Sequence, residues 1–237
     1  MTKAADSFSV DQIRKLNPAL GRSIDRHFVQ TYDEFVEYLH ADIDDALQAL
    51  EMNPELRQED AEDRLTIDLV NFLRARSYHA SHEPKVGGHV DILVQSLTHG
   101  FNWLGEAKIH SSYPIIFKGF QQLCSRYLPG TPNSNRGGLI TYVFGKNCAG
   151  VISEWKAALP TFLDQPISVS PCHSPRAPLS FISTHEHSGS GLPIVVRHMG
   201  VMLHFSPQDR EVTKSARKPR KLKASPGKAR TVKPTKA

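Results

Sequence analysis

Hydrophobic residues recur at intervals of three and four along residues 22–51, a spacing that predicts an amphipathic helix or two helices in succession. The pattern ends at Asn53-Pro54, because the residue before a proline is biased away from helical geometry. We therefore interpret residues 1–53 as a helical N-terminal extension. Its apolar positions are Phe28, Tyr32, Phe35, Leu39, Ile43, Ala46, Leu47 and Leu50.

Residues 54–144 alternate between helix and strand patterns. Strands are expected within residues 86–94 and 101–109, where turns at Gly87-Gly88 and His99-Gly100 precede largely apolar runs. A helix is expected over residues 115–128, followed by a strand in residues 137–144 that is apolar enough to be covered on both faces. An earlier helix within residues 59–78 would carry an apolar stripe of Leu65, Leu69, Phe72 and Leu73.

Residues 145–209 continue the same kind of pattern. One helix is expected over residues 151–163, and strand-like runs occupy residues 179–184, 192–199 and 200–205. We interpret residues 54–209 as one domain, with a core at 54–144 and a C-terminal elaboration at 145–209. Residues 210–237 are rich in Lys, Arg, Pro, Ser, Thr and Ala and offer little surface to bury, so a disordered basic tail is expected there.

Composition narrows the class of protein. The 237 residues are 39% hydrophobic, which is enough for a packed core and argues against general disorder. No run approaches the ~18 apolar residues of a membrane-spanning helix, and the N-terminus lacks the apolar segment of a secretory signal. The three cysteines are too few and too widely spaced for a disulfide framework. We expect a cytoplasmic protein with no membrane partner.

The net charge of +5 is the sum of an acidic main part of the chain and a strongly basic C-terminal segment. Ten of the 29 Lys and Arg residues lie in residues 213–237, which contain no acid, so residues 1–212 carry 19 basic against 24 acidic side chains. Such a tail favours contact with the phosphate backbone of a nucleic acid. The alternative is a solubilising tail with no defined partner.

The residues that suggest chemistry are Asp91, Glu106 and Lys108. Side chains alternate faces along a strand, so Glu106 and Lys108 share one face, and pairing with the strand around Asp91 would bring all three together. Ionisable groups on central strands are costly to bury unless they are paired or bound to a cation. Glu62 lies on the apolar stripe of the preceding helix and could reach the same place, with Glu59 as the neighbouring candidate.

This arrangement resembles the PD-(D/E)XK, or restriction-endonuclease-like, nuclease superfamily. The resemblance covers about residues 54–144 and depends on Gly88-His89-Val90-Asp91-Ile92 followed by Glu106-Ala107-Lys108, although Asp91 lacks the preceding proline that is common in the superfamily. It implies an α/β (α+β) fold with an αβββαβ core, to which the N-terminal helices and the basic tail would be additions.

The resemblance also implies a function. Asp91, Glu106 and Glu62 would bind Mg²⁺, which Mn²⁺ could replace, and Lys108 would position or activate the attacking water. The expected activity is hydrolysis of phosphodiester bonds, with DNA as the expected substrate, in restriction, repair or phage defence. Candidate contacts to the nucleic acid are Lys85, Gln121 and Gln122 and, in the tail, Arg217, Lys218, Arg220, Lys221 and Lys223.

Other interpretations stay open at the level of sequence. The acids and the lysine could form an ordinary salt bridge on a solvated sheet face, and the same fold could serve a non-catalytic nucleic-acid-binding or regulatory protein. The N-terminal helices could contact a second copy of the chain or a companion regulatory protein. His185 and His187 stand two residues apart with no thiolate pair nearby, which is weak spacing for zinc.

Overall fold

The computed structural model describes residues 8–208. The chain folds as a mixed α/β protein with a seven-stranded sheet. The α-helices are α1 (Val10–Leu16), α2 (Pro18–Asp25), α3 (Tyr32–Glu51), α4 (Glu62–Ala75), α5 (Tyr113–Gln122) and α6 (Cys148–Ala158). The strands are β1 (His79–His82), β2 (Ile92–Gln95), β3 (Asn102–Ile109), β4 (Arg136–Val143), β5 (Ser168–Pro171), β6 (Ser180–Glu186) and β7 (Pro193–Met202).

The sheet has the strand order β1-β2-β3-β4-β7-β6-β5. Four neighbouring pairs are antiparallel, whereas β4 at the centre runs parallel to both β3 and β7. The register of the β2–β3 hairpin sets Ile92 opposite Gly105 and Leu93 opposite Leu104. Asp91 directly precedes β2, so this register brings it beside the part of β3 that carries Glu106.

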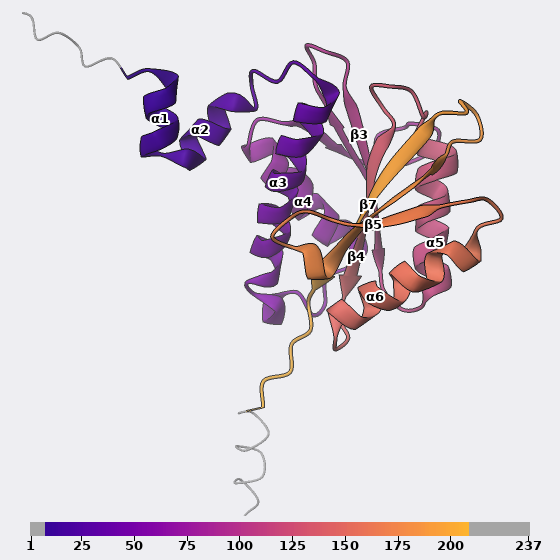
Figure 1. Ribbon diagram of the computed structural model, residues 1–237. Helices are drawn as coiled ribbons and strands as arrows, with labels where there is room; N and C mark the ends of the chain where they lie inside the picture. Colours follow the sequence, from indigo (N-terminus) through magenta and orange to yellow (C-terminus); the bar gives the residue numbers. More distant parts are fainter. Residues whose placement is uncertain (1–7, 209–237) are drawn as a thin grey trace, which may run out of the picture. The chain divides into compact units, whose positions relative to one another are not determined.

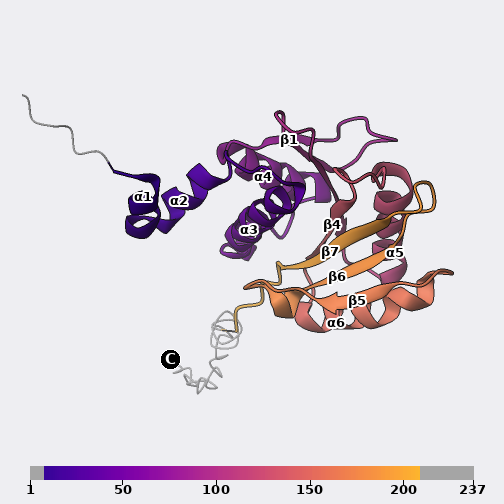
Figure 2. The same ribbon diagram turned by 45° about the horizontal axis from the view of Figure 1, so that its top comes forward.

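Helices cover both faces of the sheet, α3 and α4 on one and α5 and α6 on the other (Figure 1, Figure 2). Side chains alternate between the two faces along β3, so this strand contributes residues to the hydrophobic cores on both faces of the sheet. Trp103 and Ala107 face the core beneath α3 and α4, whereas Leu104 faces the core beneath α5 and α6. Glu106 and Lys108 continue the series of Leu104, so the two ionisable residues lie on the α5 face.

Local sequence explains where the helices begin. Thr31 and Glu34 form a capping box at the start of α3, and Asn147 caps α6 through the backbone amide of Gly150. Pro114 lies in the first turn of α5, where its missing amide hydrogen costs nothing. Helix α5 runs into a π-helical turn, Leu123–Tyr127, a feature that is frequent near functional sites.

Several elements differ from the sequence-based expectation. Phe28 is 69% exposed and precedes α3, so it does not belong to the buried stripe of that helix. The expected strands at 192–199 and 200–205 form one strand, β7, because Gly200 continues the pairing with β4. Strands β1 and β5 lack the apolar alternation that would predict them.

Helix α3 belongs to the main core, since Phe35, Leu39 and Leu47 pack in the same cluster as Leu65 and Leu69 of α4. Described residues up to Phe205 form one compact unit. Within residues 8–208, no helix combines the length and apolar character needed to cross a membrane. The expected disordered tail at 210–237 lies outside the described residues.

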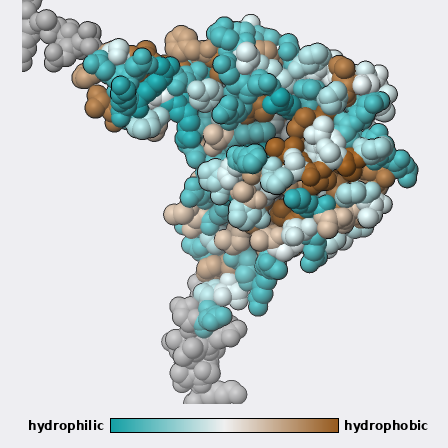
Figure 3. All heavy atoms as spheres, in the orientation of Figure 1, coloured by the Kyte–Doolittle hydropathy of each residue, from teal (hydrophilic) through white to brown (hydrophobic). Residues whose placement is uncertain are grey.

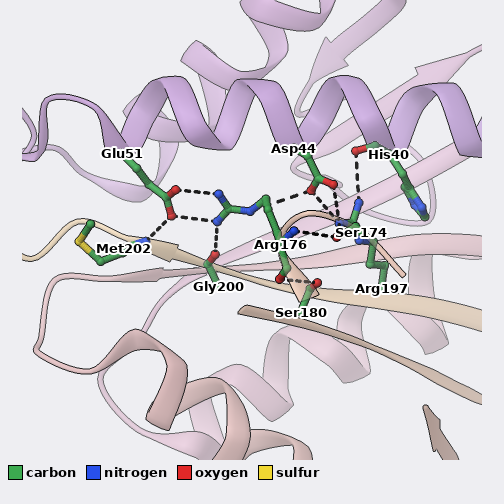
Figure 4. A network of polar contacts seen from close by, with 9 residues as sticks. All are labelled: His40, Asp44, Glu51, Ser174, Arg176, Ser180, Arg197, Gly200 and Met202. Atoms are coloured by element: carbon green, nitrogen blue, oxygen red, sulfur yellow. Dashed lines mark hydrogen bonds and ion pairs between the residues drawn. The ribbon is translucent and has the colours of Figure 1, made fainter. Parts of the chain in front are cut away.

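A buried polar network ties α3 to β7 and to the loop before β6 (Figure 4). The Arg197 guanidinium donates through Nη2 to both carboxylate oxygens of Asp44, at 2.7 and 2.9 Å, and to Ser174 Oγ at 3.0 Å. Arg176 pairs with Glu51 at 2.7 and 2.8 Å and donates to the Gly200 carbonyl at 2.7 Å. These charged contacts fix α3 over the sheet.

We expect Asp44→Ala to destabilise the fold by about 3–5 kcal/mol, because it leaves the Arg197 guanidinium, whose side chain is 2% exposed, buried without its counter-ion. Asp45→Ala is the control: its carboxylate pairs with Arg22 and Arg76 but is 33% exposed, so a smaller loss of about 1 kcal/mol is expected. Urea unfolding of both variants measures the difference, and equal losses would contradict a stabilising role for the buried pair.

Candidate active site

Glu106 and Lys108 meet on the α5 face of β3, as their spacing of two predicts. The Lys108 ammonium Nζ lies 2.8 Å from Glu106 Oε1 and donates a hydrogen bond to the Ala107 carbonyl at 2.6 Å. Glu106 is 2% exposed, and its second oxygen, Oε2, is buried without a hydrogen-bond partner. A buried carboxylate oxygen left unpaired is costly, and it marks a position that a cation or a donor could satisfy.

Asp91 joins this pair from the end of the hairpin. It stands directly before β2, although the sequence pattern predicts a strand that already includes it. Asp91 Oδ2 accepts a hydrogen bond from the Ala107 amide at 2.8 Å and lies 3.6 Å from Lys108 Nζ. The expected convergence of the three residues is therefore present.

The helical acid is Glu62, the first residue of α4, which reaches the cluster from the opposite face of the sheet. Glu62 Oε1 accepts a hydrogen bond from Lys108 Nζ at 3.0 Å, and Oε2 accepts one from the Ile109 amide at 2.9 Å. Glu59 is exposed in the turn before α4 and makes no hydrogen bond or ion pair within residues 8–208. Of the two sequence candidates, Glu62 is the one that touches Lys108. We call Glu62, Asp91, Glu106 and Lys108 the carboxylate cluster.

Three carboxylates around one ammonium shift the titration of the cluster. Burial, and then the negative charge of Asp91, raises the pKa of Glu106 to about 7. Burial opposes the charged form of Lys108, but its hydrogen bond to Glu106 and the attraction of the carboxylates outweigh that cost and raise its pKa. Burial followed by the charges of Glu106 and Asp91 also raises the pKa of Tyr127, so this phenol lies within electrostatic reach of the cluster.

Helix α5 closes over the cluster at Gly119. A Cβ atom at this position would lie 2.8 Å from Lys108 Cγ and 3.4 Å from Glu106 Cγ. Glycine in the middle of a helix is unfavourable, so its presence indicates a close approach of the backbone, which is a signal the sequence did carry. Gly119 and Tyr127 are neighbours of the cluster that are not among the site residues expected from the sequence.

The donor chemistry of the cluster suits a hard divalent cation. Mg²⁺ prefers carboxylate and carbonyl oxygens and usually takes only one or two protein carboxylates, with water and phosphate completing its shell. Glu106 Oε2 is unpartnered, and Asp91 lies beside it on the hairpin. Within residues 8–208, no group of three or more His, Cys, Asp or Glu side chains is arranged to hold a metal ion. His185 and His187 therefore belong to no such group there. The Lys108 ammonium stands between the carboxylates instead.

The predicted nucleic-acid contacts separate in space. Lys85 is exposed, and its backbone forms an isolated antiparallel β-bridge with that of His89 across the Gly87-Gly88 turn. Gln122 follows Gly119 by three residues and therefore lies on the cluster side of α5, whereas Gln121 lines a cavity with His185 and His187 on the other side. The tail candidates Arg217, Lys218, Arg220, Lys221 and Lys223 lie outside the described residues.

A cleft of about 590 Å³ lies on the other face of the sheet, between α3 and strands β6 and β7. Figure 3 shows hydrophobic residues gathered beside α3 at this place, bordered by hydrophilic ones. The cleft contains none of the carboxylate cluster, and its arginines are already paired: Arg22 with Asp45, Arg136 with Asp33 and Arg197 with Asp44. It is separate from the candidate active site.

The raised pKa of Glu106 predicts a dependence of stability on pH. Its folded pKa of about 7 exceeds the ordinary value of 4.5, so the folded state binds the proton more tightly than the unfolded state does. In EDTA, this residue should therefore make the protein less stable as the pH rises from about 4.5 through 7. We expect Glu106→Gln to remove that loss. Urea unfolding at pH 5 and pH 8 tests this, and an equal pH dependence in both proteins would refute it.

Comparison of the chain with family models, with curated proteins and with solved structures finds no match.

Proposed function

We propose that this protein is a divalent-metal-dependent nuclease that hydrolyses phosphodiester bonds in DNA. The observation that carries the proposal is the convergence of Glu62, Asp91 and Glu106 on the single ammonium of Lys108, at 3.0, 3.6 and 2.8 Å. Carboxylates beside a buried lysine, with one carboxylate oxygen unpartnered, combine cation ligands with a group that can hold an attacking water.

The order of elements around the cluster supports the same proposal. The run α4-β1-β2-β3-α5-β4 has the same order as the αβββαβ core that the resemblance implies, with Glu62 on α4, Asp91 directly before β2 and Glu106 and Lys108 on β3. Strand β1 supplies the strand that the sequence pattern does not predict. The agreement concerns element order and residue positions, and restriction, repair or phage defence would each be compatible with it.

Asp91, Glu106 and the carbonyl of Ala107 offer the oxygens that would hold Mg²⁺. When bound, this ion would supply positive charge to the scissile phosphate and lower the pKa of a coordinated water. Lys108 donates hydrogen bonds within the cluster, and an ammonium in this position can orient the attacking water and stabilise charge on the phosphate. Glu62 positions Lys108, because it accepts a hydrogen bond from Nζ while the Ile109 amide fixes its other oxygen.

The test is cleavage of supercoiled plasmid DNA by the full-length protein. We expect conversion to nicked or linear forms with Mg²⁺ or Mn²⁺ and none with EDTA, whereas Ca²⁺ should bind without supporting turnover. Glu62→Gln should slow cleavage, and Glu59→Gln should not, because of these two acids only Glu62 contacts Lys108. Binding of DNA without cleavage under any of the metal conditions would favour a non-catalytic nucleic-acid-binding or regulatory protein on the same fold.

A further inference from the structure

Basic residues near the carboxylate cluster differ in their partners from those around the buried Asp42. On the side of α2, α3 and α4, Arg22, Arg26 and Arg76 all contact Asp42. Near the carboxylate cluster, Lys85, Lys118 and Arg126 are exposed, and none of them forms an ion pair within residues 8–208. We call these three residues the basic rim.

Two of the three rim residues lie on segments that touch each other. Gly87, at a φ of +63°, approaches the π-helical turn so closely that a Cβ would lie 2.0 Å from the Arg126 carbonyl oxygen. A Cβ on Gly88 would lie 3.1 Å from the ring of Tyr127. Lys85 stands two residues before this contact. The tip of the hairpin formed by β1 and β2 therefore brings Lys85 into the neighbourhood of Arg126.

The third rim residue, Lys118, lies on the side of α5 that is next to the carboxylate cluster. Gly119 abuts Lys108 and Glu106, and the helical repeat sets Lys118 and Gln122, four residues apart, along the edge of α5 that faces the hairpin. The opposite edge carries Phe120 and Gln121, which line the cavity next to His185. The basic rim therefore borders the carboxylate cluster from the hairpin and from α5.

We infer that the basic rim of Lys85, Lys118 and Arg126 binds the phosphate backbone of duplex DNA and guides a phosphodiester to the carboxylate cluster. This inference rests on the proposed function. The cluster has three carboxylates for one ammonium, so by itself it repels a polyanion. Exposed cations without counter-ions in the protein are free to replace the counter-ions of phosphates, and they pay no cost for breaking an ion pair first. Glu83, exposed at the base of the hairpin, is the acid nearest to Lys85 along the chain.

The experiment compares two double variants of the full-length protein, each of which removes two positive charges. K85Q/K118Q alters the rim, whereas K15Q/K156Q alters two lysines on α1 and α6 that also lack an ion pair within residues 8–208. Binding to a fluorescent 20-base-pair duplex is measured by anisotropy in EDTA, and again with Ca²⁺, at several salt concentrations. R126Q is measured in the same way.

We expect K85Q/K118Q to bind about tenfold more weakly at 50 mM salt and to flatten the slope of log K against log salt by about 2, since each phosphate contact contributes about 0.9. R126Q should flatten it by about 1, and K15Q/K156Q should match the wild type. Melting temperatures should stay within a few degrees, because none of these side chains forms an ion pair.

The outcomes distinguish the two proposals. Equal salt slopes for wild type, K85Q/K118Q and R126Q would refute the binding of DNA by the basic rim, even if the wild type cleaves DNA with Mg²⁺. The same loss of slope in the control pair would also overturn it, because the binding would then follow net charge alone. A flattened slope confined to the rim variants, in a protein that never cleaves with Mg²⁺ or Mn²⁺, would support the rim and refute the nuclease.

Discussion

Glu106→Gln is expected to reduce the rate of plasmid cleavage by at least about a hundredfold. Glutamine keeps the shape of the side chain, but it removes the negative charge whose second oxygen, Oε2, is free to bind a cation. Loss of a metal ligand removes at least ~3 kcal/mol of transition-state stabilisation, and each ~1.4 kcal/mol is tenfold in rate. The measurement is single-turnover cleavage with Mg²⁺ at pH 8, above the pKa of about 7 that burial confers on Glu106.

The control for this variant is Glu59→Gln, the same substitution at an exposed acid without hydrogen bonds in the described part of the chain. It should cleave at the wild-type rate. Both proteins should remain folded, because Glu106 sits beside Asp91 as a like charge and contributes little net stability without a metal. Cleavage by Glu106→Gln at the wild-type rate would remove the carboxylate cluster from the mechanism.

Lys108→Met is expected to change two properties in opposite directions, abolishing cleavage while tightening the binding of divalent metal. The ammonium lies within hydrogen-bond reach of Glu62 and Glu106 and therefore competes with a metal ion for their oxygens. Its removal leaves three carboxylates with no internal cation. Two unit charges 4 Å apart interact by ~4 kcal/mol in a partly buried setting, so about a tenfold gain in affinity uses a modest part of that repulsion.

Isothermal titration calorimetry with Mn²⁺ at pH 8 measures the affinity, and the rise in melting temperature with metal gives a second readout. Lys118→Met is the control for metal binding alone, because this lysine is exposed on α5 and forms no ion pair with the carboxylates. If Lys108→Met bound metal more weakly than the wild type, the ammonium would be supporting the metal site instead of competing with it. If neither protein bound metal, the proposed nuclease would lose its cofactor.

The sequence anticipated the elements that have a strong hydrophobic period. Helices α3 and α4 and strands β3 and β4 follow from stripes and apolar runs, because burial of one face imposes its own repeat on the chain. Strands β1 and β5 could not be found in this way. They are four residues long, lie at the two edges of the sheet and contain few apolar residues, so their backbone pairing with β2 and β6 defines them.

The candidate site likewise contains features that the local sequence predicts and features that depend on tertiary packing. Alternation along a strand is a local property, so the common face of Glu106 and Lys108 could be deduced from their spacing alone. The choice of Glu62 over Glu59 could not, because both precede the stripe of α4 and only the crossing of α4 over the end of β3 selects one. Gly119 carried a signal as a helical glycine, yet what it approaches is visible only once α5 packs on β3.

By itself, the sequence determined the mixed helix and strand content, the basic character of the last 25 residues and the pairing of an acid with a lysine on one strand face. These are consequences of composition and of short repeats. The tertiary structure decided the strand order, the entry of Glu62 from the opposite face, the unpartnered oxygen of Glu106 and the position of the ammonium among three carboxylates. Each of these depends on contacts between segments more than ten residues apart, and no local period in a chain encodes which distant segments will meet.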